Sequence, residues 1–138
     1  KGWMWIRDRN KTMGQRIIAK LHEWMTGTGL LYLKYAMPQV GCVFTTHATV
    51  LGRCVAGNNL PLYSEMKNYV PEELARRFNV VSKQSLEKTA ARNADCFTTV
   101  SEITATECSH FLDVDVDLVT PNGFENVFTP KETEFEEK

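Results

Sequence analysis

The sequence predicts an α/β domain with a doubly wound parallel sheet. Strand-like segments alternate with helix-like segments along the chain, and three of the four strand segments are apolar or β-branched runs without polar alternation. Such unbroken runs are typical of parallel strands covered on both faces. With 138 residues, 43% of them hydrophobic, the chain is long enough to bury one core without a metal or disulfide.

The first two predicted strands are each followed by a helix. Residues 17–21 form a short apolar run, and a glycine- and threonine-rich turn at 25–29 leads into an apolar helix that Pro38 ends. Residues 40–46 predict a second buried strand. The segment 48–54 predicts the start of the next helix.

The longest helix is predicted over residues 71–93. Pro71 lies in its first turn, and two acids follow it where the positive end of the helix dipole favours them. Apolar residues recur at helical spacing along one side. They are Leu74, Phe78, Val81, Ala90 and Ala94.

A third strand and helix complete the alternation. Residues 96–100 predict a strand, and Ser101 is a suitable N-cap for a helix that continues to Leu112. Residues 117–120 predict a fourth strand.

Polar residues follow the predicted strands at their carboxyl ends, where open parallel sheets bind ligands. His22 and Glu23 follow the first strand, His47 the second, Ser101 the third and Asn122 the fourth. Ser101 lacks the Gly-x-Ser-x-Gly elbow of a hydrolase nucleophile. The sequence therefore predicts a polar cleft at this edge of the sheet.

Each candidate in this cleft also has a structural interpretation. His22 and His47 could act on a ligand, or could be hydrogen-bonded caps of their strands. Glu23 could orient a ligand hydroxyl or tune a histidine, or could cap the next helix. Arg53, six residues after His47, could bind phosphate through a bidentate fork, or be surface charge. Asn122 precedes a glycine, which indicates a turn that could also present an amide to a ligand.

Composition excludes several classes of function. The net charge is −1, so neither nucleic acid nor another polyanion is expected as a partner. The four cysteines contain no Cys-x-x-Cys pair, which argues against a structural metal. Without a signal peptide or a long apolar run, free thiols predict the reducing cytoplasm and no membrane partner. The Gly-Thr-Gly at 27–29 is too short for a dinucleotide fingerprint.

Five strings, in order and in register, resemble one enzyme family. They are LHEWMTGTGL (21–30), VFTTHATVLGR (43–53), NNLPLY (58–63), CFTTVSEITATE (96–107) and VTPNG (119–123). They are similar to glycogen (starch) synthases of the animal and fungal type, glycosyltransferase family 3. The resemblance implies that residues 17–128 are part of the Rossmann-like N-terminal domain of a GT-B glycosyltransferase. Residues 1–16 are a segment of uncertain structure, and 129–138 an acidic tail.

The resemblance also implies an activity: transfer of glucose from UDP-glucose to the non-reducing end of an α-1,4-glucan, with retention of configuration and without a cofactor or metal. His47 would lie near the transferred glucose and Glu23 would line the sugar pocket, as the catalytic pair. Arg53 would lie near the anionic donor groups, with His22 and, at the cleft rim, Asn122 as further substrate-binding residues. Such a reaction builds positive charge on the sugar ring and negative charge on the departing diphosphate.

Other parts of the family pattern have no counterpart here. The glycine-rich loop, the helical insertion used for tetramers and the C-terminal domain with its catalytic carboxylates are missing. We therefore expect a fragment that is inactive alone, from a homo-oligomeric parent. The alternatives are another retaining GT-B glycosyltransferase, or a non-catalytic glucan-binding or scaffolding module that stacks sugars on Trp3, Trp5 and Trp24.

Overall fold

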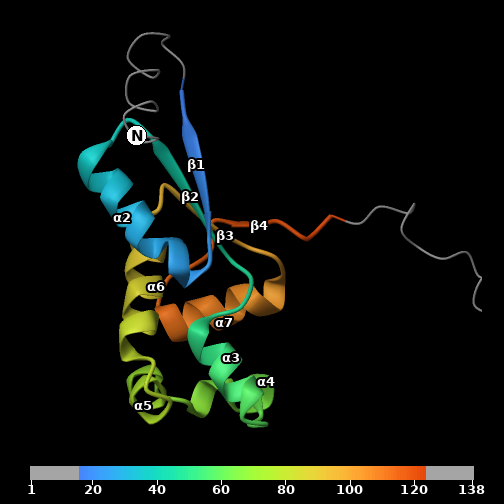
Figure 1. Cartoon of the computed structure of the whole chain (residues 1–138). Coiled ribbons are helices and arrows are strands. Elements are labelled where there is room, and N and C mark those ends of the chain that lie inside the picture. The colour runs from blue at the N-terminus through green and yellow to red at the C-terminus, as the bar shows by residue number, and fades with distance from the viewer. Residues whose placement is uncertain (1–15, 124–138) are drawn as a thin grey trace, which may run out of the picture.

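Four parallel strands form one sheet in a computed structural model that describes residues 16–123. The strands are β1 (Ile18–His22), β2 (Gly41–Thr46), β3 (Cys96–Thr99) and β4 (Leu118–Val119). They pair in the order in which they occur along the chain, and helices connect them (Figure 1). The predicted α/β class, a Rossmann-like fragment, is confirmed. The segment 1–15, with Trp3 and Trp5, and the acidic tail lie outside the described residues.

Helices follow each of the first three strands. They are η1 (Trp24–Thr26) and α2 (Gly27–Ala36) after β1, then α3 (Val50–Gly57), α4 (Leu62–Glu65), η2 (Met66–Asn68), α5 (Pro71–Arg77) and α6 (Val81–Asn93) after β2, and α7 (Glu102–Leu112) after β3. In Figure 1, α2 lies beside β1 and β2, α6 contacts α2 and extends below it, and α3, α4 and α5 lie below the sheet, beyond the end of β2. The short α4 and η2 are not among the predicted elements.

The core has two parts. One packs the sheet against α2, α6 and α7, with the rings of Phe44 and Phe97 stacked at 5.8 Å between their centroids. The other packs α3 against α5 and α7 around Leu51, Val55 and Phe111. Phe44 of β2 belongs to the first part and Val50 of α3 to the second, so the turn that carries His47 connects the two parts along the chain. At the edge of the described sheet, by contrast, Ile18 of β1 is 70% exposed.

The prediction of a single helix over residues 71–93 is wrong. The chain forms two helices, α5 and α6, because Asn79 adopts the left-handed conformation with φ of 55°. The amide of Val80 donates to the carbonyl of Ala75 and that of Asn79 to Arg76. This is the Schellman arrangement, for which asparagine is a suitable residue after glycine. The helices then take separate directions, and Val81 is half exposed instead of buried.

Caps account for two other helix starts. Ser101 caps α7 as predicted, since its hydroxyl accepts a hydrogen bond from the amide of Thr104. The helix predicted from residue 48 begins at Val50, because the hydroxyl of Thr49 accepts from the amide of Gly52. The two residues left between β2 and this cap, His47 and Ala48, form the turn at the sheet edge.

All four cysteines are free thiols. Cys42 and Cys108 are buried, and burial raises the pKa of both thiols, so neither is a ready nucleophile. Within residues 16–123, every helix is too short or too polar to cross a bilayer.

Candidate functional site

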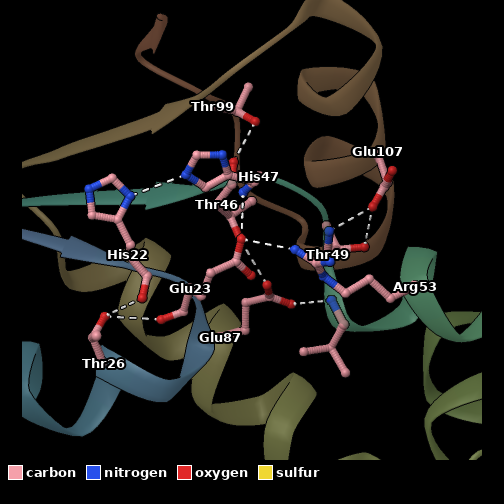
Figure 2. A network of polar contacts seen from close by, with 11 residues as sticks. His22, Glu23, Thr26, Thr46, His47, Thr49, Arg53, Glu87, Thr99 and Glu107 are labelled. Carbon is pink, nitrogen blue, oxygen red and sulfur yellow. Dashed lines mark hydrogen bonds and ion pairs between the residues drawn. The ribbon is translucent and has the colours of Figure 1, made fainter. Parts of the chain in front are cut away.

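Two histidines meet at the carboxyl ends of β1 and β2. Nδ1 of His22 lies 3.2 Å from Nε2 of His47, and the rings stack with centroids 5.4 Å apart (Figure 2). The parallel register explains the contact, because His22 pairs with Thr45, two residues before His47. One ring must donate and the other accept, so the hydrogen bond requires at least one neutral imidazole.

Glu23 connects β1 to η1 through an unusual backbone conformation. Its φ of 63° and ψ of 163° lie in a region that almost only glycine adopts, at a cost of about 1–3 kcal/mol. Several hydrogen bonds hold it there: its amide donates to the carbonyl of Thr45, and the amide and hydroxyl of Thr26 donate to its own carbonyl. Strain of this kind is concentrated at functional sites.

The Glu23 carboxylate joins the residues of this edge. Its Oε1 accepts from the amide of His47 at 3.0 Å and from Nη2 of Arg53 at 3.1 Å. It makes no hydrogen bond that caps η1, so the capping interpretation of Glu23 does not hold. Its side chain is only 16% exposed, whereas that of Arg53 is 57% exposed, so the guanidinium keeps donors free for an anion from solvent.

His22, Glu23, His47 and Arg53 therefore form one group, which we call the strand-end cluster (Figure 2). Asn122 is not part of it. It lies beyond β4 on an exposed segment, and within the described residues no hydrogen bond links it to the cluster. Its place in the site stays a prediction.

Two buried glutamates lie beneath the cluster, and neither was a predicted site residue. Glu87 of α6 accepts from the Thr46 hydroxyl at 3.0 Å and from the Val50 amide at 2.9 Å. Glu107 of α7 accepts from the amide and the hydroxyl of Thr49 at 2.7 and 2.6 Å. The side chains thus hold the turn from both sides of His47.

Burial determines the ionisation of one of them. It raises the pKa of Glu87 to about 7, against the hydrogen bonds from Val50 and Thr46, and the negative charges of Glu23 and Glu107 raise it further. Glu87 is 0% exposed and Glu107 1%. Among the described residues, no group of three His, Cys, Asp or Glu side chains could hold a metal ion.

A parallel sheet covered by helices, with two histidines and a carboxylate at adjacent strand ends and an arginine on the helix that follows, defines a Rossmann-like α/β domain. Comparison with known proteins narrows this class. The glycogen synthase family model matches residues 4–136. The chain therefore belongs to the glycogen synthase family.

Curated relatives agree. The chain is 39% identical over 110 residues to the liver glycogen [starch] synthase of Mus musculus, a match that covers 80% of this chain and 16% of the relative. It is 38% identical over 107 residues to the glycogen [starch] synthase of Caenorhabditis elegans, covering 78% and 16%. The corresponding protein of Dictyostelium discoideum is 39% identical over 108 residues, covering 78% and 12%. The match thus covers about one sixth of the length of these relatives or less.

The strain at Glu23 makes a testable prediction about stability. We expect Glu23→Gly to be more stable than Glu23→Ala by about 1–2 kcal/mol, because both lose the carboxylate but only glycine adopts φ of 63° without strain. Urea denaturation of the two variants measures the difference. In an ordinary conformation alanine would be the more stable residue, so alanine equal to or above glycine would contradict the strained backbone.

Proposed function

We propose that this chain is part of the N-terminal domain of an enzyme that transfers glucose from UDP-glucose to the non-reducing end of an α-1,4-glucan with retention of configuration. The observation that carries the proposal is the convergence of His47, Glu23 and Arg53 at one sheet edge, in a chain of the glycogen synthase family. The relatives are named glycogen [starch] synthase and are several times longer, so residues 17–128 would act with a second GT-B domain.

The proposed roles follow from charge and exposure. His47, held in place by its hydrogen bond with His22, would contact the transferred glucose as positive charge develops on the ring. Arg53 would stabilise the departing diphosphate with its exposed guanidinium. Glu23 uses Oε1 for its two bonds, which leaves Oε2 for a sugar hydroxyl. Asn122 would contact the substrate at the cleft rim.

The compartment and the assembly of the parent are also proposals. Four free thiols among the described residues support the reducing cytoplasm. The homo-oligomeric state of the parent stays a prediction.

Incorporation of labelled glucose from UDP-glucose into glycogen tests the function. We expect the full-length protein that contains this chain to incorporate label with retention, and the 138-residue chain alone to incorporate none, because its match covers only 16% of the relative's length. A full-length protein without transfer, while it binds UDP-glucose and glycogen, would contradict the proposal.

The glucan-binding alternative receives no support from the described tryptophan. Trp24 is partly buried against the core around Leu51, and the Lys83 ammonium lies 5.2 Å from its ring centroid. A packed, covered ring is a poor stacking surface for a sugar.

A further inference from the structure

Three carboxylates, one from the connection between β1 and η1, one from α6 and one from α7, bind the turn that carries His47. Glu23 accepts from the amide of His47, Glu107 from the amide of Thr49 and Glu87 from the amide of Val50 (Figure 2). The first carboxylate is itself a member of the strand-end cluster. The other two approach from α7 and α6, on the side of the core.

Glu87 and Glu107 are placed at a considerable energetic cost. Each is essentially inaccessible to solvent, and within residues 16–123 neither forms an ion pair. Desolvation of a carboxylate costs several kcal/mol in a protein interior. What offsets this cost is the Thr46 hydroxyl at the end of β2 together with the amides of Thr49 and Val50 and the Thr49 hydroxyl at the N-terminus of α3, where the helix dipole also favours negative charge. All of these bonds fix one short piece of backbone.

We propose that Glu87 and Glu107 are positioning residues of the transfer reaction: they fix the turn from Thr46 to Val50 and through it the place of His47. This inference rests on the proposed function. It predicts an effect on turnover rather than on donor affinity. His47 is short and moves with its backbone, whereas the exposed Arg53 has several rotatable bonds and can follow a small shift of α3. A misplacement of about 1 Å costs on the order of 100-fold in rate.

Gly52 offers a way to move one carboxylate without removing it. A Cβ at this position of α3 would lie 2.1 Å from Oε1 and 2.5 Å from Cδ of Glu107. Gly52→Ala therefore displaces the Glu107 carboxylate from Thr49, while alanine is otherwise the better residue inside a helix. Gly57→Ala on the same helix is the matched control, because its Cβ meets no atom within 4 Å.

The experiment compares kcat and KM for UDP-glucose in the full-length protein and in Gly52→Ala, Glu107→Ala, Glu107→Gln and Gly57→Ala. We expect Gly52→Ala and Glu107→Ala to lower kcat by about 10- to 100-fold with KM within about threefold of wild type. Glutamine keeps an acceptor oxygen for Thr49, so Glu107→Gln should retain kcat within about fivefold. Gly57→Ala should equal wild type.

Several results would overturn the inference. Wild-type kcat in a folded Gly52→Ala, or a rise in KM as large as the fall in kcat, would show that the turn does not position His47. A loss in Glu107→Gln as great as in Glu107→Ala would exclude positioning by these hydrogen bonds. If Glu107→Ala does not fold, Gly52→Ala decides alone. A wild-type protein without transfer refutes the proposed function itself, whereas an active wild type with unaffected variants refutes only this inference.

Discussion

Replacement of His47 by alanine in the full-length protein is expected to lower kcat for glucose transfer by about 100-fold or more. His47 lies at the carboxyl end of β2. Its imidazole is hydrogen-bonded to His22, and its backbone amide donates to the Glu23 carboxylate, so the residue is fixed before substrate binds. Removing one fixed group that stabilises developing charge typically costs about 10²–10³ in turnover. Steady-state transfer of labelled glucose into glycogen measures the effect.

His110→Gln is the matched control for this prediction. His110 lies on α7, away from the strand-end cluster, and its Nε2 is 3.0 Å from the carbonyl of Tyr69, a bond that a glutamine amide can also make. We expect its kcat to stay within about twofold of wild type, because its contacts are with Tyr69 and Phe111 and not with the strand-end cluster. Equal losses in both variants would mean that histidine substitution disturbs the fold, and an unchanged His47→Ala would remove this residue from the proposed mechanism.

The second large effect concerns pH and stability. Burial raises the pKa of Glu87 from 4.5 to about 7, so between these values the folded chain binds more protons than the unfolded chain. The contribution of Glu87 to the free energy of unfolding of the wild type is therefore fully present below about pH 4.5, and it is lost as the pH rises through 7. The loss amounts to about 3 kcal/mol. Glu87→Gln does not titrate, so we expect its stability relative to wild type to improve by this amount between pH 4 and pH 8.

Urea denaturation of wild type and Glu87→Gln at several pH values tests this expectation. Glutamine can keep both hydrogen bonds, because the Thr46 hydroxyl can accept as well as donate. The exposed Glu102→Gln on α7 is the control, with a change below about 1 kcal/mol. A constant difference between wild type and Glu87→Gln over this range would contradict the raised pKa.

The sheet was predictable because its signal is local. Residues 40–46 and 96–100 are continuous β-branched or apolar runs, and a buried parallel strand needs little else. Parallel strands that follow one another in the chain end at the same edge of the sheet. The proximity of His22 and His47 could therefore be predicted from their places at the ends of successive strands. The adjacency of Glu23, His47 and Arg53 depends on the same rule.

The break between α5 and α6 could not be predicted, because the apolar residues keep their helical spacing across it. Leu74, Phe78 and Val81 keep helical spacing across it, and Asn79 ends a helix only when tertiary packing selects its left-handed conformation. The conformation of Glu23 is likewise beyond local sequence, because a non-glycine residue in that region exists only where the surrounding hydrogen bonds hold it.

The buried glutamates were missed for a different reason. A charged residue on a helix ordinarily faces solvent, and on that rule Glu87 and Glu107 are unremarkable. A signal was nevertheless present, because each occupies a position three or four residues from members of a buried face. Those members are Gln84, Ala90 and Ala91 for Glu87, and Thr104 and Phe111 for Glu107. An acid on the apolar side of a helix is a candidate for a buried structural role.

The central claim is that Glu23 and His47 work as one unit in glucose transfer, and a double-mutant cycle tests it most directly. Transfer from UDP-glucose into glycogen is measured for the full-length wild type, Glu23→Ala, His47→Ala and the double variant. Because Glu23 binds the amide of His47, we predict that the transfer rate of the double variant is no more than about threefold below that of the less active single variant. Losses that multiply, or wild-type rates in either single variant, would contradict the claim.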